Sequence, residues 1–175
     1  MDLNEYVAKN GIPCSMKADE HVFFQGDESQ SLYIVKGGLL KAYYLSADGK
    51  EHIKSFLLPG DTIGSLSAIH SGQNCTFSLL CLKPCELVAL NFSDLYAASL
   101  EDPEISANIV DFLLKFGMKK EMREFELLCL SAEDRYRKLR DSTPELFDLV
   151  TQNEIARYLG VTPVALSRIK HRLTA

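Results

Sequence analysis

The last 25 residues place the strongest constraint on the fold. Their pattern predicts two helices joined by a turn that contains a glycine. Thr151 can cap a first helix, and Glu154, three residues later, can complete a capping box. Gly160 stands where that helix must end in the left-handed conformation, which glycine adopts without strain. Thr162 can cap a second helix with Pro163 in its first turn. The segment therefore predicts a helix-turn-helix, a motif that places its second helix in the major groove of DNA.

The two faces of the second predicted helix differ in chemistry. Leu166, Ile169 and Leu173 repeat at i, i+3 and i+7, so we expect them to face a core. Arg168 lies on the opposite face and suits bidentate recognition of a guanine. The predicted DNA contacts are Thr151, Gln152, Thr162, Val164, Ser167, Arg168, Lys170, His171 and Arg172. An ordinary helical hairpin with a glycine turn is the alternative interpretation.

Positive charge is concentrated in the same segment. Residues 151–175 carry four basic residues against one acidic residue, a net charge of +3. The rest of the chain carries 15 basic against 23 acidic residues, a net charge of −8. This distribution is the one expected where a basic segment of an acidic protein meets phosphates. Short helical segments also reach +3 by chance, so the charge supports DNA binding without establishing it.

Upstream of this segment, short apolar runs alternate with turn residues. The runs are rich in Val, Ile, Leu, Phe and Tyr and are separated by turns such as Gly37-Gly38 and Asp48-Gly49. The predicted strands are residues 21–25, 31–36, 39–45, 51–58, 76–82 and 86–91. Closely spaced strands of this kind predict an all-β roll or barrel. A short helix over residues 2–10, ended by Gly11 and Pro13, is expected before it.

A change of period after residue 101 predicts one long helix. Asp102 can cap it, with Pro103 in its first turn. A helix through residue 130 would be about 42 Å long, which is more than a small β-roll can cover. Its apolar residues follow coiled-coil spacing, and we expect a homodimer seam. The predicted seam residues are Ile105, Ile109, Phe112 and Phe116, then Met118, Met122, Phe125 and Cys129. Packing within one chain is the alternative.

A further helix is predicted after a break at Ser131, because Ser131 and Asp134 have the spacing of a capping box. The chain is therefore expected to be α+β, with three parts. They are a sensor β-roll (1–102), a dimerisation helix (103–130) and a helix-turn-helix domain (131–175). The last part has few residues for an independent core and is expected to lean on the long helix.

A β-roll, a long helix and a terminal helix-turn-helix, in this order, resemble the cyclic-AMP receptor protein/fumarate-nitrate regulator (Crp/Fnr) superfamily of bacterial transcription factors. The residues that carry the resemblance are 24–27 (FQGD), 32–37 (LYIVKG), 59–64 (PGDTIG), 131–135 (SAEDR) and the helix-turn-helix. The resemblance covers nearly the whole chain and implies a cyclic-nucleotide-binding-like jelly roll. The sequence ends at Ala175, so the expected form is a shortened winged helix without its β-hairpin wing.

The resemblance also indicates where an effector would bind. Cyclic-nucleotide-binding members use a glutamate for the ribose hydroxyl and an arginine-serine pair for the cyclic phosphate. The matching residues here are Ser65, Cys75 and Thr76. A thiol cannot replace the charge and paired donors of a guanidinium, so we expect no cyclic-AMP response. The candidate pocket for an unknown small-molecule effector comprises Gly64, Ser65, Leu66, Ser67, Cys75 and Thr76.

Other chemistries find little support in the sequence. Only Cys14 lies near the N-terminus, which does not support the iron–sulfur cluster of the oxygen-sensing branch. Cys75, Cys81 and Cys85 lack the spacing of a metal site and are expected to be small buried residues. No H-x-H pair, nucleophile elbow or Gly-rich phosphate loop indicates an enzyme. We expect no cofactor, no metal and no membrane span, and a location in the reducing cytoplasm.

The sequence thus predicts a cytoplasmic, dimeric transcription regulator that binds a palindromic site in double-stranded DNA, with RNA polymerase as a candidate partner. Many family members begin the recognition helix with an arginine and a glutamate, whereas this chain has Pro163 and Val164. The operator sequence therefore cannot be transferred from better-known members. The alternative is a ligand-binding or protein-interaction module of the same fold that has lost sequence-specific DNA binding.

Overall fold

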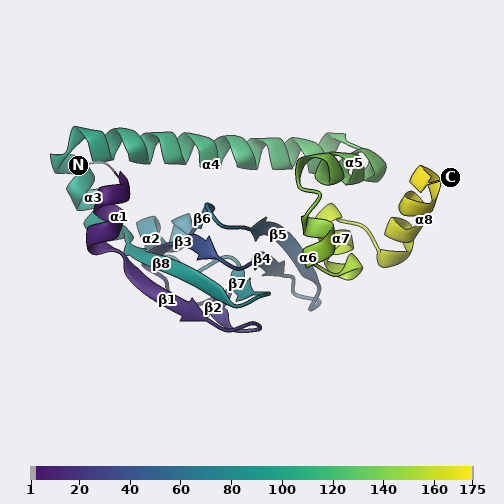
Figure 1. Cartoon of the computed structure of the whole chain (residues 1–175), viewed down its shortest axis with the longest axis horizontal. Helices are drawn as coiled ribbons and strands as arrows, with labels where there is room; N and C mark the ends of the chain where they lie inside the picture. Colours follow the sequence, from purple (N-terminus) through teal and green to yellow (C-terminus); the bar gives the residue numbers. More distant parts are fainter. Residues whose placement is uncertain (1–2, 175) are drawn as a thin grey trace.

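The structure is a computed structural model and describes residues 3–174. A long helix, α4 (Pro103–Cys129), runs along one side of the molecule (Figure 1). The β-roll lies beneath most of α4, and the C-terminal helices lie at and beyond its far end (Figure 1). The α+β architecture expected from the sequence is confirmed.

Two four-stranded antiparallel sheets form the roll within residues 3–174. The first has the order β1-β8-β3-β6 and the second the order β2-β7-β4-β5. The strands are β1 (Ile12–Met16), β2 (His21–Phe23), β3 (Ser31–Gly37), β4 (Leu40–Leu45), β5 (Glu51–Leu57), β6 (Thr62–Ile63), β7 (Ser78–Cys81) and β8 (Cys85–Asn91). Apolar side chains from both sheets, including Val35, Leu40, Leu79 and Leu87, fill the space between them. All six predicted strands are present, with ends shifted by a few residues.

Four short elements of the roll were not predicted from the sequence. They are β1, β6, α2 (Leu66–Ser71) and α3 (Phe92–Glu101). Pro13 was expected to end the N-terminal helix α1 (Leu3–Asn10), yet it lies inside β1, which pairs with β8 alone. Proline is tolerated in such an edge strand, because one side of the strand needs no backbone donor. Asn91 caps α3 by accepting a hydrogen bond from the Asp94 amide.

Helix α4 begins where the sequence predicted. The Asp102 carboxylate accepts hydrogen bonds from the amides of Glu104 and Ile105, and Pro103 occupies the first turn. The helix continues through Gly117 to Cys129 without a break. Because α4 is one regular helix, the apolar residues predicted before Gly117 and those predicted after it lie on different faces of the helix.

The predicted dimer seam is wrong in its first half. Ile105 is buried, and Ile109 packs on the cluster that contains Leu90 and Leu95 of the roll. Phe112 lines a small cavity beside the same cluster, and Phe116 lines a cavity against β5 and β6. The alternative, packing within one chain, holds for these residues, because α1, α3 and the roll supply the apolar neighbours that the sequence pattern could not reveal.

The C-terminal helices pack as one unit against the end of the roll. They are α5 (Ala132–Ser142), α6 (Leu146–Leu149), α7 (Gln152–Leu159) and α8 (Pro163–Thr174). Ser131 caps α5 by accepting from the Asp134 amide, as expected. Ile155, Leu159 and Leu166 share a buried cluster with Leu39, and Phe56 packs against it. The C-terminal segment therefore shares its core with the roll as well as leaning on α4.

Candidate nucleic-acid interface

The helix-turn-helix has the local geometry that its sequence predicts. The Thr151 hydroxyl accepts from the Glu154 amide at 3.3 Å, and the Glu154 carboxylate accepts from the Thr151 amide at 3.0 Å, which completes the capping box. Gly160 ends α7 with φ of 69° and ψ of 33°. The Thr162 hydroxyl accepts from the Ala165 amide at 3.2 Å and so caps α8. These caps fix the turn between α7 and α8 in one conformation.

Two arginines hold the C-terminal end of α7. The Arg135 guanidinium donates to the Leu159 carbonyl at 2.9 and 3.1 Å and to the Leu130 carbonyl at 2.6 Å. Arg123 of α4 donates to the Tyr158 carbonyl and stacks over the Tyr158 ring, 3.9 Å from its centroid. The last carbonyls of a helix lack partners within the helix, so cations here satisfy both hydrogen bonding and the helix dipole. The sequence does not predict this role of Arg123 and Arg135, because the carbonyls that they contact lie 35 and 24 residues away.

A cluster of ion pairs joins α7 to the roll. Lys41 of β4 is buried, and its ammonium lies 2.6 Å from Glu51 of β5 and 3.5 Å from Glu154 of α7. Arg157 of α7 lies 3.4 Å from the same Glu51 carboxylate. Lys41 and Glu154 are largely shielded from water and need partners in a defined geometry, so the cluster favours one orientation of α7 on the roll.

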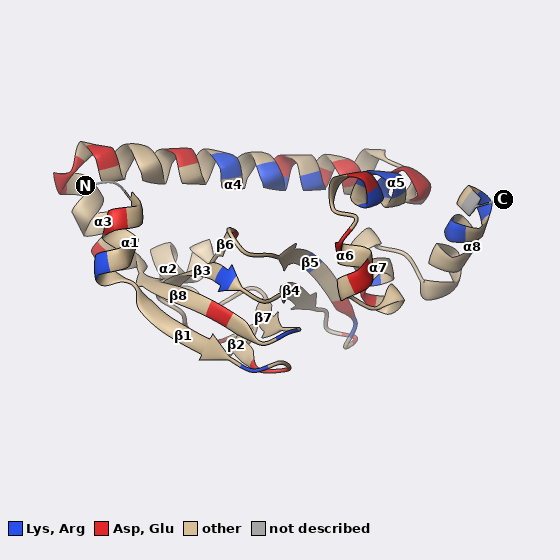
Figure 2. Cartoon of the chain, viewed as in Figure 1, with Lys and Arg blue, Asp and Glu red and all other residues tan. Residues whose placement is uncertain are grey.

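Helix α8 exposes the face that the sequence pattern predicts to contact DNA. Val164 is 62% exposed, and Ser167, Arg168 and His171 are also exposed. Leu166 and Ile169 are buried on the opposite face, as predicted. The described part of α8 contains Arg168, Lys170 and Arg172 and no acidic residue (Figure 2).

The other predicted contacts already have partners within the chain. Lys170 donates to the Gln152 side chain at 2.9 Å, and Arg172 lies 3.3 Å from Glu133 of α5. Thr151 and Thr162 act as helix caps. Arg168 differs, because it has no ion-pair or hydrogen-bond partner among residues 3–174. Its planar guanidinium therefore presents a fork of donors to an incoming acceptor.

The structure does not gather the candidate effector residues around one cavity. Gly64, Ser65 and Cys75 are buried, and the Ser65 hydroxyl lies 3.2 Å from that of Ser67. Leu66 and Ser67 line a groove against α3 and α4, whereas Thr76 is exposed. Burial raises the pKa of the Cys75 thiol, so this position offers a neutral group where the family uses a cation.

Cys81 and Cys85 fit the expectation of small buried residues, whereas Cys14 is partly buried and Cys129 is exposed. Cys81 and Cys85 are buried in β7 and β8, and burial with the nearby Cys85 raises the pKa of the Cys81 thiol to about 12. Across residues 3–174, no three His, Cys, Asp or Glu side chains gather in a way that could hold a metal ion. In the same part of the chain, no helix is both long and apolar enough to cross a membrane.

Known proteins with similar sequences and folds are transcription regulators. The family model of the cyclic nucleotide-binding domain matches residues 13–102, slightly more than half of the chain. The transcriptional activator protein Anr of Pseudomonas protegens is 26% identical, over 97% of this chain and 72% of its own length. The cyclic AMP receptor protein of Thermus thermophilus is 27% identical, over 87% of this chain and 72% of its own length.

The solved structure of FixK2 from Bradyrhizobium japonicum has the same fold. It superposes with a TM-score of 0.81 at 20% identity, covering 94% of this chain and 84% of FixK2. The roll, the long helix and the helix-turn-helix thus agree with the relatives in order and arrangement. The chain belongs to the Crp/Fnr superfamily of transcription regulators, with a cyclic nucleotide-binding domain over residues 13–102.

Proposed function

We propose that the protein regulates transcription by inserting α8 into the major groove of an operator. The observation that carries the proposal is the exposed Arg168, which has no partner among residues 3–174 on a helix whose start and packing are fixed by caps. A guanidinium in this position can donate two hydrogen bonds to a guanine. Ser167 and His171 flank it, and Val164 offers an apolar contact such as a thymine methyl group requires.

We infer that Gln152, Lys170 and Arg172 contact the DNA backbone. Lys170 and Gln152 bond to each other across α7 and α8, and together they form a polar edge beside the base-reading face. Thr151 and Thr162 place backbone amides at helix starts, where phosphates bind favourably. Contacts of this kind set position and affinity and carry no sequence information.

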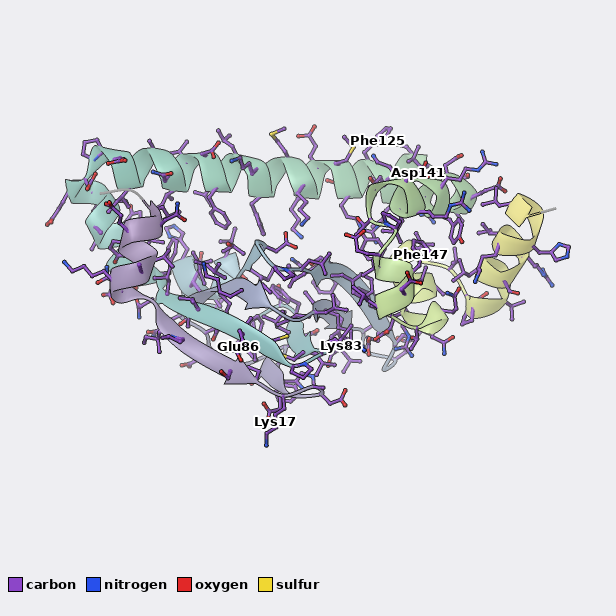
Figure 3. All side chains as sticks on the ribbon, viewed as in Figure 1. Lys17, Lys83, Glu86, Phe125, Asp141 and Phe147 are labelled. Atoms are coloured by element: carbon purple, nitrogen blue, oxygen red, sulfur yellow. The ribbon has the colours of Figure 1, made fainter. Side chains whose placement is uncertain are left out.

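The dimer surface that we propose lies on the outer face of α4. Val110, Leu114, Phe125 and Leu128 are each at least half exposed. At 3.6 residues per turn they lie, with Gly117, on one face of the helix. Figure 3 shows Phe125 on the side of α4 away from the sheets. Nothing within 4 Å would meet a Cβ atom on Gly117, so a second helix could approach closely there. This stripe replaces Ile105, Ile109, Phe112 and Phe116 as the proposed seam.

A two-fold dimer would present two α8 helices to one side of the DNA. The site would then be a palindrome with half-sites about 34 Å, or one turn, apart. A cytoplasmic regulator of this type would further act through RNA polymerase. An effector, if bound, is expected to differ from cyclic AMP, since Ser65 and Cys75 lack the charges that the ribose and cyclic phosphate require.

Selection of bound duplexes from a randomised library tests the DNA-binding role. Arg168→Ala should weaken binding by about 1–3 kcal/mol and relax the preference at one position per half-site. Lys170→Ala should weaken all sequences alike and reduce the salt dependence. Arg140→Ala on α5 is a matched control, because Arg140 is exposed outside the proposed interface. Unchanged base preferences in Arg168→Ala would refute the base-reading role, and no selected motif would favour a module that has lost DNA binding.

A further inference from the structure

A buried lysine of the roll contacts the residue that completes the capping box of the helix-turn-helix. Lys41 of β4 is 6% exposed, and its ammonium lies 2.6 Å from Glu51 of β5 and 3.5 Å from one carboxylate oxygen of Glu154. The other oxygen of Glu154 accepts hydrogen bonds from the amide and the hydroxyl of Thr151. A single carboxylate therefore joins the first turn of α7 to the roll.

The ion pairs between α7 and the roll have a reciprocal pattern of charge. Arg157 of α7 lies 3.4 Å from the same Glu51 oxygen that Lys41 contacts. The roll thus supplies one cation and one anion, Lys41 and Glu51, and α7 supplies one of each, Glu154 and Arg157. A displacement that brought Glu154 to Glu51 would place like charges together, so the pattern selects one position of α7.

The apolar contacts around these charges hold α7 on the roll with less directional preference. Leu39 of the roll shares a buried cluster with Ile155 and Leu159, and the Phe56 ring lies 5.4 Å from that of Tyr158. Apolar burial depends on the area removed from water and is non-directional. The energy of a pair of charges depends on their separation. We therefore assign the position of α7 on the roll chiefly to the ion pairs.

The position of α7 determines the position of α8. Gly160 and the Thr162 cap fix the turn between the two helices. The ion pairs hold the first turn of α7 on the roll, and Arg123 and Arg135 hold its last turn on α4 and α5. Because α7 is held at both ends, the location of α8 relative to α4 is set. In a two-fold dimer built on α4, this location sets the distance between the two α8 helices.

We propose that Lys41 and Glu51 are positioning residues that fix the half-site spacing accepted by the dimer. Neither residue contacts DNA in this proposal. The base preference within a half-site comes from the exposed face of α8, whereas the preference for one distance between half-sites comes from two residues of the roll. The inference rests on the proposed function, because it requires a dimer that reads two half-sites.

Binding of the full chain to duplexes of different spacing tests this role. One duplex is the palindrome that the wild type selects, and the other has two base pairs inserted at its centre. The insertion moves one half-site by about 7 Å and rotates it by about 70°. The wild type should bind the second duplex about tenfold or more weakly. In Lys41→Met the ratio of the two affinities should fall to about threefold or less, because Glu51 and Glu154 lose their shared cation and α7 can follow the displaced half-site.

Two further variants and a single half-site duplex complete the experiment. Glu51→Gln keeps the shape of the side chain and removes the charge that both Lys41 and Arg157 contact. It should change the ratio in the same direction, and it tests the role even if Lys41→Met does not fold. Lys50→Met is the matched control, because Lys50 is an exposed neighbour of Glu51 and pairs only with the exposed Asp48 among the ion pairs of residues 3–174. Affinity for one half-site, and the base preference within it, should equal those of the wild type in all three variants.

Several outcomes would overturn the proposal. They are a wild-type ratio in the folded variants, equal binding of both duplexes by the wild type, and a loss of base preference that accompanies the loss of spacing preference. The last result would mean that the helix-turn-helix itself is damaged. A wild type that selects no motif would contradict the proposed function and the positioning role with it. A selected palindrome with an unchanged ratio in the variants would contradict the positioning role alone.

Discussion

Both faces of α4 carry apolar residues, but the two faces have different surroundings. On the inner face, Ile105 and Ile109 pack into the core, and further along the helix Arg123 holds the end of α7. On the outer face, Leu114 and Leu128 are 61% and 77% exposed and contact no other part of the described chain closely enough to be covered. The inner face packs against the roll and α7, and the outer face is the one on which we propose that a second copy of the chain packs.

This difference shows what helical periodicity can and cannot establish. The spacing of apolar residues reveals that a face is buried, because an exposed stripe of that size is unfavourable in water. It does not reveal which neighbour covers the face. The roll lies beside the inner stripe only because the strands fold back over a distance of many residues, so the assignment needed the three-dimensional structure.

The largest expected effect comes from placing charges on the outer face. The double variant Leu114→Glu and Phe125→Glu should weaken self-association by at least about 4 kcal/mol, since charges would be buried without partners in the dimer. Analytical ultracentrifugation should show a dimer for the wild type and a monomer for the variant. Lys115→Glu, a change on the exposed surface of the same helix, serves as the control. A monomeric wild type at micromolar concentration would rule out the proposed seam.

A substitution on the inner face of α4 should lower the stability of the fold and leave self-association unchanged. Phe112→Ala should lower the free energy of unfolding by about 3 kcal/mol, because Phe112 is partly buried beside Ile109 and α1. The variant should still be a dimer. Denaturant titration at one fixed protein concentration measures the loss, and sedimentation measures the association state. If Phe112→Ala instead produced a stable monomer, the two faces would have to be exchanged.

Much of the fold could be predicted because its signals are local. The caps at Asp102, Ser131 and Thr151 and the glycine that ends α7 lie within a few residues of the backbone groups that they satisfy. The strand β1 was missed because an edge position, which makes Pro13 acceptable, is a property of the whole sheet. Helix α3 was not predicted, although its cap is local, because the capping residue Asn91 is also the last residue of the apolar strand β8.

The candidate site also has parts that local sequence signals predict and parts that they do not. The exposed face of α8, with Arg168 and Ser167, follows from helical spacing alone. The contacts that hold α7 could not be predicted, because Arg123 and Tyr158 are 35 residues apart and Arg135 and Leu159 are 24 residues apart. The burial of the Lys54 ammonium also depends on long-range contacts. Lys54 lies in a run that predicts a strand, and its burial beneath α4 cannot be read from that run.

Titration of Lys54, which lies in β5 beneath the inner face of α4, makes the stability of the protein depend on pH. With a pKa of about 6 in the folded protein and an ordinary value of 10.5, Lys54 binds more protons in the unfolded state between these pH values. Stability should therefore rise with pH across this window. Lys54→Met should raise the free energy of unfolding by about 2 kcal/mol at pH 6, with a smaller gain at higher pH. Urea titrations at pH 6, 7.5 and 9 measure the gap, and a destabilised variant would show that Lys54 has a buried partner.

The smallest expected effect concerns the contact between the inner face and α7. Arg123→Met removes the hydrogen bond to the Tyr158 carbonyl and the stacking on its ring, but Arg135 still holds the neighbouring Leu159 carbonyl. The expected loss is about 1 kcal/mol, confined to the opening of α7. Amide hydrogen exchange should become faster in α7 while the strands of the roll exchange at wild-type rates. Lys115→Met, which has no contact with α7, should leave both rates unchanged. An equal increase in exchange rate throughout the chain would mean that α7 and the roll open together. Arg123 would then stabilise the whole molecule rather than the contact between α4 and α7.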